Sequence, residues 1–241
     1  MINIQNVHKS FGDLEVLKGI DLDVKKGEVL SIIGSSGSGK STLLYCINAI
    51  EKIQKGKIIV DDIDVHHPDT NQDQLRQRLG MVFQQWNSFP HLTVLENAAL
   101  APRVVKKMSK DEAMAIAEKE LIHVGLGDKF DVYPTKLSGG QQQRLAIARA
   151  LAMKPNYMLF DEITSALDPE LVGEVLDTLR ILREDGMTMI CVTHEIAFAR
   201  DVSDKVAYFQ HGVIEEMGPP DQVISNPQKE TTQKFLSKVL S

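Results

Sequence analysis

The amino-acid sequence predicts an α/β fold with a mixed, mainly parallel sheet, an antiparallel β layer and an inserted helical subdomain. Short apolar runs of β-forming residues alternate with helix-like stretches, as in buried parallel strands connected by helices. The first sixty residues contain shorter strand-like runs, one with alternating polarity, which indicates an antiparallel layer. From Thr93 to Pro134 the pattern is helical. The 241 residues suffice for one domain of two lobes with a substantial core.

The expected elements follow in order along the chain. Strands of the antiparallel layer are expected at Ile2–Val7, Glu15–Leu17, Ile20–Val24 and Lys57–Val60, and parallel strands at Val29–Ile33, Met81–Phe83, Tyr157–Phe160 and Thr188–Val192. Helices are expected at Ser41–Ala49, Lys110–Val124, Gln141–Met153 and Pro169–Glu184, and a hairpin at Lys205–Gln210 and Val213–Met217 with His211-Gly212 as its turn. The core lobe with its antiparallel layer then covers approximately residues 1–92 and 155–241, and the helical subdomain approximately residues 93–150.

A glycine-rich loop follows the first buried strand. Residues 34–41 read Gly-Ser-Ser-Gly-Ser-Gly-Lys-Ser, and a strand before and a helix after are the context in which this pattern binds phosphate. The glycines let backbone N–H groups face an anion, and the helix N-terminus adds partial positive charge. Lys40 can reach the β- and γ-phosphates, and Ser41 can ligate Mg²⁺. The expected ATP contacts are Ser35, Ser36, Gly37, Ser38, Gly39, Lys40, Ser41 and Thr42. An ordinary glycine-rich surface turn is the alternative, which the flanking strand and helix disfavour.

Two carboxylates come directly after the apolar run Tyr157–Phe160. Asp161 should lie at the carboxyl end of a buried strand, where open α/β sheets bind ligands, and is the predicted carboxylate ligand of Mg²⁺. Glu162 should face a water beside the γ-phosphate as a general base, an effect typically worth about 10²–10⁴-fold in rate. A solvated acidic pair is the alternative, and the phosphate loop favours the catalytic interpretation.

A second anion site is predicted about a hundred residues after the first. Leu137-Ser138-Gly139-Gly140-Gln141 places two glycines at the start of an expected helix, with Ser138 as its cap. A single chain rarely needs two cradles for one γ-phosphate. The pattern therefore predicts two copies packed head to tail, each offering Ser138, Gly139, Gly140 and Gln141 to the ATP of the other. A capped helix start without a ligand is the alternative.

These motifs together resemble those of the ATP-binding-cassette ATPases, which have a P-loop NTPase core of the RecA-like type. The resemblance extends from Met1 to the C-terminus, with all motifs in the family's order. It implies that Phe11 stacks on adenine, that Gln84 senses Mg²⁺ and the γ-phosphate, that Asp168 crosses the dimer seam and that His194 contacts the γ-phosphate. Taken singly, Phe11 could be a core aromatic, Gln84 part of a solvated pair and His194 a strand-end histidine without a ligand.

Longer segments resemble the polar amino acid uptake branch of that family. Residues 82–97, 164–175, 187–195, 215–220 and 232–240 carry this likeness. It implies partnership with two integral membrane permease subunits and, indirectly, an external substrate-binding protein, for import of amino acids such as glutamine, histidine, arginine or lysine. Departures are Ile163 in place of a usual Pro, Ser35 in place of a frequent Pro, Tyr45 where Arg is common, and Gln210-His211 in place of a more acidic turn.

The bulk composition limits the partners. The formal net charge is −6, which argues against attraction to nucleic acid or anionic lipid. No apolar run approaches the roughly 20 residues of a membrane helix, and the first residues lack a signal-peptide pattern. We expect a peripheral protein at the cytoplasmic face of the cell membrane that is soluble when isolated. Cys46 and Cys191 lie in apolar surroundings without metal-ligand spacing and are expected to be reduced core residues.

Three rival interpretations remain. Cassette ATPases acting on DNA or ribosomes usually carry two cassettes, a long coiled coil or basic extensions, none of which the sequence shows. A small-molecule kinase would need an arginine-rich lid and no Leu-Ser-Gly-Gly-Gln segment. Cassettes for lipoprotein release, cell division or efflux keep similar cores and differ in cargo. In the transporter interpretation the surface near Gln84, Trp86 and Phe89 would dock the membrane partner, although both rings could instead belong to the core.

Overall fold

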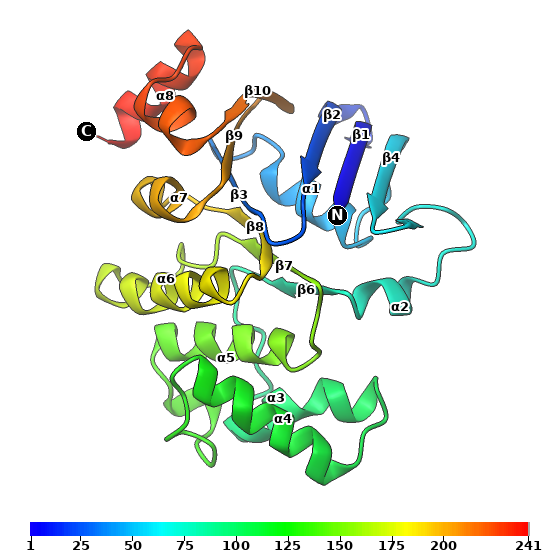
Figure 1. Ribbon diagram of the computed structural model, residues 1–241, viewed down its shortest axis with the longest axis vertical. Helices are drawn as coiled ribbons and strands as arrows, with labels where there is room; N and C mark the ends of the chain where they lie inside the picture. Colours follow the sequence, from blue (N-terminus) through cyan, green and yellow to red (C-terminus); the bar gives the residue numbers. More distant parts are fainter. Residues whose placement is uncertain (241) are drawn as a thin grey trace.

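The computed structural model describes residues 1–240, which form two β-sheets and a layer of helices (Figure 1). The four-stranded sheet has the order β2-β1-β4-β5 and is antiparallel. The six-stranded sheet has the order β10-β9-β3-β8-β7-β6. The strands are β1 Ile2–Phe11, β2 Leu14–Val24, β3 Val29–Gly34, β4 Lys55–Val60, β5 Ile63–Asp64, β6 Leu79–Val82, β7 Tyr157–Asp161, β8 Thr188–Val192, β9 Lys205–Gln210 and β10 Val213–Gly218. The predicted mixed, mainly parallel sheet with an antiparallel layer is confirmed.

Eight α-helices connect and cover these strands in residues 1–240. They are α1 Lys40–Ile47, α2 Gln72–Arg76, α3 Val94–Val104, α4 Lys110–His123, α5 Gly139–Leu151, α6 Pro169–Glu184, α7 Ile196–Val202 and α8 Glu230–Val239, with short helical turns at Pro134–Lys136 and Asp221–Ser225. Helix α1 lies beside the four-stranded sheet, whereas α3, α4 and α5 stack on the opposite side of the six-stranded sheet (Figure 1). None of the helices in this described part of the chain combines the length and the apolar character that crossing a membrane requires.

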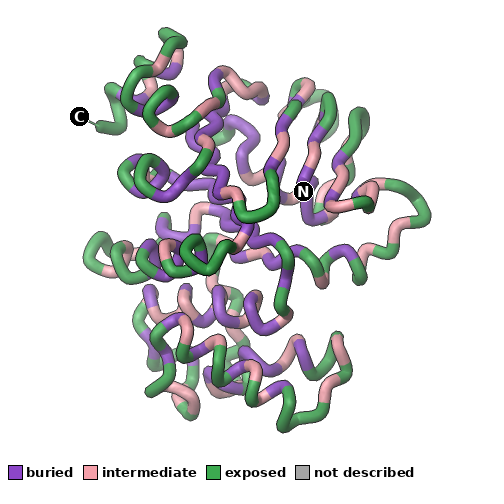
Figure 2. Tube along the Cα trace, viewed as in Figure 1, coloured by how far each residue is buried: buried purple, intermediate pink, exposed green. Residues whose placement is uncertain are grey.

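The six-stranded sheet separates two large cores because its side chains alternate between faces. Met158 and Phe160 of β7 face the helices, where they join one apolar cluster with α3 to α6. Tyr157 and Leu159 of the same strand face α1 and the antiparallel sheet in a second cluster. Strands β3, β7 and β8 are buried along their whole length, as Figure 2 shows for the middle of the molecule. Continuous apolar runs therefore predicted the central strands well.

Two sequence predictions about strands were wrong. The expected strands Glu15–Leu17 and Ile20–Val24 form one strand, β2, because Gly19 takes a φ of +82° and continues the pairing through a register shift. The expected strand Met81–Phe83 is β6, which begins at Leu79 and ends at Val82. Gly80 lies within that strand, and a Cβ atom there would lie 2.4 Å from the sulfur of Met158, so a larger residue would displace that side chain.

Three helices on one side of the six-stranded sheet, α3, α4 and α5, begin at strong caps. Thr93, Ser109 and Ser138 precede α3, α4 and α5, and each forms a reciprocal capping box with the residue three positions later. The prediction that Ser138 caps a helix is confirmed, although the helix starts at Gly139 and not at Gln141. The predicted helix Pro169–Glu184 and the turn at His211-Gly212, where φ is +51° and +86°, are also confirmed.

Both cysteines are free and buried, as predicted. Burial raises the pKa of the Cys46 thiol to about 12, and nearby Glu51 adds to the shift while Lys9 opposes it. Burial alone raises the pKa of Cys191 to about 12.

We predict that neither thiol reacts with Ellman's reagent at pH 8 while the protein is folded. The reason is that the thiolate is the attacking species and both thiols are inaccessible and protonated at that pH. Absorbance at 412 nm should show two reactive thiols per chain only after urea is added. Rapid stoichiometric reaction of the folded protein would contradict the buried positions.

Candidate nucleotide-binding site

The glycine-rich loop between β3 and α1 contains three glycines at positive φ, Gly34, Gly37 and Gly39, where any other residue would strain the backbone. Gly34 has a φ of +149°, and a Cβ atom there would lie 2.2 Å from the carbonyl oxygen of Phe209. Gly39 has a φ of +104° and directly precedes α1. A Cβ atom at Gly37 would meet no atom within 4 Å, so this part of the loop borders open space. The loop thus takes a fixed left-handed course while one side stays accessible.

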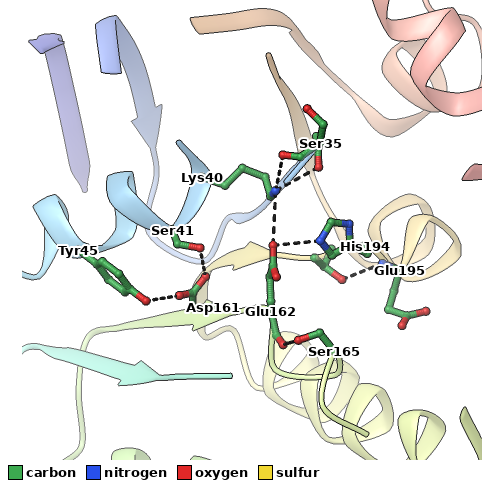
Figure 3. Close-up of polar contacts among 11 residues, drawn as sticks. Ser35, Lys40, Ser41, Tyr45, Asp161, Glu162, Ser165, His194 and Glu195 are labelled. Carbon is green, nitrogen blue, oxygen red and sulfur yellow. Dashed lines mark hydrogen bonds and ion pairs between the residues drawn. The ribbon is translucent and has the colours of Figure 1, made fainter. Parts of the chain in front are cut away.

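Lys40 lies at the start of α1 with its side chain nearly buried, at 3% exposure. Its Nζ atom donates to the carbonyl oxygens of Gly34 at 3.1 Å and Ser35 at 3.0 Å. The same atom lies 3.4 Å from Oε1 of Glu162 (Figure 3). The ammonium group is therefore held inside the loop, beside the backbone that should bind phosphate.

Asp161 ends β7 and is clamped by two hydroxyl groups of α1. Its Oδ1 accepts a 2.6 Å hydrogen bond from Ser41, and its Oδ2 accepts a 2.8 Å hydrogen bond from Tyr45 (Figure 3). Burial and the hydrogen bond to Asp161 raise the pKa of Tyr45 to about 12. The sequence predicted Ser41 and Asp161 as joint ligands of Mg²⁺, but the contact of Tyr45 with Asp161 was not predicted. The available signal was its spacing, because a residue four positions after Ser41 lies on the same helix face.

Glu162 follows Asp161 in a left-handed backbone conformation, with a φ of +48°. Its backbone N–H donates to the carbonyl oxygen of Val192, which fixes the turn against β8. Its Oε1 lies 3.0 Å from Nε2 of His194, so one carboxylate oxygen contacts both His194 and Lys40 (Figure 3). A non-glycine residue at positive φ carries strain, which is common at functional sites.

The structure leaves three predicted residues outside this cluster. Gln84 is exposed in the segment after β6, and no hydrogen bond within residues 1–240 joins its side chain to Ser41 or Asp161. Phe11 is 48% exposed at the end of β1, and the Nζ atom of Lys9 lies 4.4 Å from its ring centroid, a contact that was not predicted. Asp168 is exposed just before α6, with no side-chain hydrogen bond to the helix start.

The Ser-Gly-Gly-Gln segment lies in the helical layer, away from the glycine-rich loop. Figure 1 places α5 below the six-stranded sheet and α1 above it. Ser138 is exposed, and its side chain is engaged in the capping box with Gln141. Gly139 packs closely, since a Cβ atom there would lie 3.1 Å from Leu167 and 3.3 Å from the ring of Trp86. The two predicted anion sites of one chain are thus separate.

The residues of the first site fit a nucleoside triphosphate with a divalent cation. The loop offers open space at Gly37, a nearly buried ammonium at Lys40 and an unpartnered buried hydroxyl at Ser38. Ser41 and Asp161 bring hydroxyl and carboxylate oxygens together, which are donors that Mg²⁺ prefers. These features define a phosphate-loop nucleoside triphosphatase.

The chain belongs to the ABC transporter family, whose sequence pattern matches residues 17–165. It is 52% identical to the glutamine transport ATP-binding protein GlnQ of Geobacillus stearothermophilus, over the whole of both chains. It is also 52% identical to the arginine transport ATP-binding protein ArgV of Corynebacterium glutamicum, over 100% of this chain and 98% of the relative.

A solved structure of the same kind supports this membership. The dimeric ATP-binding cassette MJ0796, bound to ADP and Pi in a post-hydrolysis state, aligns with a TM-score of 0.79 at 38% identity, over 91% of this chain and 99% of that chain. The chain is accordingly an ATPase with the fold of these cassettes.

We predict that Gly34→Ala destabilises the protein and weakens ATP binding. Its methyl group would meet the carbonyl of Phe209, an overlap that typically costs about 1–3 kcal/mol or more where backbone must move. Urea unfolding and calorimetric titration with ATP measure both effects. Gly173→Ala is the control: it lies within α6 with no atom near its Cβ position and should gain up to about 1 kcal/mol. Equal behaviour of the two variants would contradict the tight packing at Gly34.

Proposed function

We propose that this chain is the ATP-hydrolysing subunit of a membrane transporter that imports a polar amino acid. The observation that carries the proposal is the full-length similarity to proteins named for glutamine and arginine transport. In this proposal two copies of the chain act at the cytoplasmic face of the membrane. They work with two integral membrane permease subunits and, through these, with an external substrate-binding protein.

ATP would bind across the glycine-rich loop and the end of β1. In this proposal, backbone N–H groups of the loop would donate hydrogen bonds to the phosphates, and Lys40 would contribute its ammonium. Phe11 presents an exposed ring on which adenine can stack. The Lys9 ammonium near that ring restricts its orientation.

Ser41, Asp161 and Gln84 are the residues proposed to hold Mg²⁺. The cation supplies neutralisation of charge on the β- and γ-phosphate oxygens. Ser41 and Asp161 are already in contact, whereas Gln84 would approach from the exposed segment after β6. Because Gln84 must move toward the other two, it can report the presence of nucleotide to that segment.

Glu162 is proposed to accept the proton of the attacking water. His194 and Lys40 both contact its Oε1 and hold the side chain at the carboxyl ends of β3, β7 and β8. His194 is 45% exposed, so its ring can also reach the γ-phosphate. Ile163, which replaces a usual Pro after the base, is buried at 4% exposure and so anchors the turn by packing.

The second half of each catalytic centre would come from a second copy of the chain. Ser138 is exposed and Gly139 and Gln141 are half-buried at the start of α5, whereas Gly140 is buried. Helix α5 and the glycine-rich loop before α1 lie on opposite sides of the six-stranded sheet (Figure 1). Dimeric cassettes of known structure have a similar fold. ATP between the two surfaces would close the dimer, and Asp168 would contact the partner across the seam. Loss of the γ-phosphate removes an anionic contact and opens the dimer.

A groove beside the segment after β6 is proposed to dock the permease. It has a volume of about 460 Å³ and includes Trp86, Phe89, Val104, Val105 and Arg149. Phe89 is 37% exposed, and the guanidinium of Arg149 lies 4.9 Å from its ring centroid. Trp86 is half-buried with its ring against Gly139. The groove therefore connects the docking surface with the start of α5.

We predict that Ser138→Arg leaves ATP binding to a single chain intact but abolishes dimer-dependent turnover, because the long side chain fills the shared cradle. ATP titration and phosphate release measure the two properties. Ser109→Arg is the matched control, since it removes the same kind of cap from α4 at a cost of about 1 kcal/mol and should hydrolyse ATP normally. Normal hydrolysis by Ser138→Arg would refute the shared site.

Transport itself is tested in proteoliposomes that contain this chain, its permease subunits and the binding protein. We predict that one polar amino acid stimulates ATP turnover and enters the vesicles. Glu162→Gln should bind ATP, trap a dimer and lose about 10²–10⁴-fold in turnover. Stimulation by a lipoprotein or an apolar drug would instead assign the chain to a release or efflux system. Brisk hydrolysis by Glu162→Gln would remove Glu162 from the role of base.

A further inference from the structure

The hydrogen bond between Tyr45 and Asp161 joins the helix after the glycine-rich loop to the end of β7. We infer that Tyr45 is a positioning residue that fixes the rotation of the Asp161 carboxylate and thereby sets the affinity of the site for its divalent cation. The inference rests on the proposed function, because it takes Ser41 and Asp161 as the residues that hold this cation.

Each oxygen of the Asp161 carboxylate accepts a hydrogen bond from a different hydroxyl group. Ser41 donates to Oδ1 at 2.6 Å, and Tyr45 donates to Oδ2 at 2.8 Å. The terminal torsion of an aspartate is otherwise broad, so two fixed donors are needed to select one orientation. Asp161 is only 4% exposed, which limits the access of water that could replace a lost donor. Without the Tyr45 hydroxyl, Oδ2 has no other hydrogen-bond donor within the described residues.

The ring of Tyr45 is itself held in place by Phe83. Their centroids lie 6.3 Å apart, with the ring planes at 44°. Phe83 comes directly after β6 and directly before Gln84, the third proposed residue of the cation site. Tyr45 therefore ties together three segments that supply the proposed ligands: α1, the end of β7 and the segment after β6. A displacement of the last segment would shift the Tyr45 ring and, through its hydroxyl, the carboxylate.

A purely structural role for Tyr45 makes a different prediction. A hydroxyl that only satisfies a buried carboxylate would contribute to folding stability, and its loss would not alter the cation affinity of the folded protein. Partners that orient a metal ligand, by contrast, typically change metal affinity about 10–100-fold when they are removed. The two roles are therefore separated by measuring cation binding and stability on the same variants.

The test compares the affinity of Tyr45→Phe and wild type for Mn²⁺ in the presence of one equivalent of ADP. Free Mn²⁺ is measured by electron paramagnetic resonance. The variant keeps the ring against Phe83 and removes only the hydroxyl. We expect Mn²⁺ affinity to fall by about tenfold, while ADP affinity in EDTA stays within about twofold. Tyr208→Phe is the matched control. It deletes the hydroxyl of another tyrosine, which donates to Gln210 at 3.2 Å in a different apolar cluster, and should change neither affinity.

Unchanged Mn²⁺ affinity in a folded Tyr45→Phe protein would overturn the inference, as would an equal loss in Tyr208→Phe. If Tyr45→Phe does not fold, Phe83→Leu provides a second variant, because it retains the hydroxyl but removes the ring that orients it. A measurable loss of Mn²⁺ affinity in Phe83→Leu supports the inference, and wild-type affinity overturns it. ATP turnover and amino acid uptake by the wild-type protein decide the proposed function separately, so the two ideas can fail independently.

Discussion

The parallel register of three neighbouring strands is the constraint on which the site depends. Val192 of β8 lies opposite Ile32 of β3 on one side and opposite Asp161 of β7 on the other. The three strands therefore end at one level, and the residues that follow them meet at the same edge of the sheet. Lys40 lies more than a hundred residues before Glu162 and His194 in the sequence. In the fold, one carboxylate oxygen of Glu162 contacts the side chains of both Lys40 and His194.

The close packing beneath this edge allows little adjustment. Gly34 passes directly over the carbonyl of Phe209, and Glu162 adopts a left-handed backbone that is held by its N–H bond to Val192. Strained backbone of this kind persists only where surrounding packing fixes it. The two apolar clusters on either face of the sheet provide that support, because β3, β7 and β8 are buried from end to end.

The helical layer holds the Ser-Gly-Gly-Gln segment, which is the proposed second half of the catalytic centre, at the start of α5. Helices α3, α4 and α5 each start at a capping box and pack together in one cluster with one face of the six-stranded sheet. Trp86 contacts the start of α5 at Gly139, and the neighbouring groove opens to the surface. A partner seated in this groove would touch the same residues that orient the Ser-Gly-Gly-Gln segment. In the proposed function, docking in this groove and completion of the catalytic centre would therefore be mechanically connected through Trp86.

The sequence by itself determined the local features of this protein. Continuous apolar runs identified β3, β7 and β8, the spacing of glycines identified the phosphate loop, and Ser138 was identified as a helix cap, because each feature depends on neighbouring residues. Tertiary structure alone decided the bulged course of β2 through Gly19, the contact of Tyr45 with Asp161 and the sharing of Glu162 between Lys40 and His194. These depend on which strands become neighbours, and that choice is made by long-range packing, which no local pattern records.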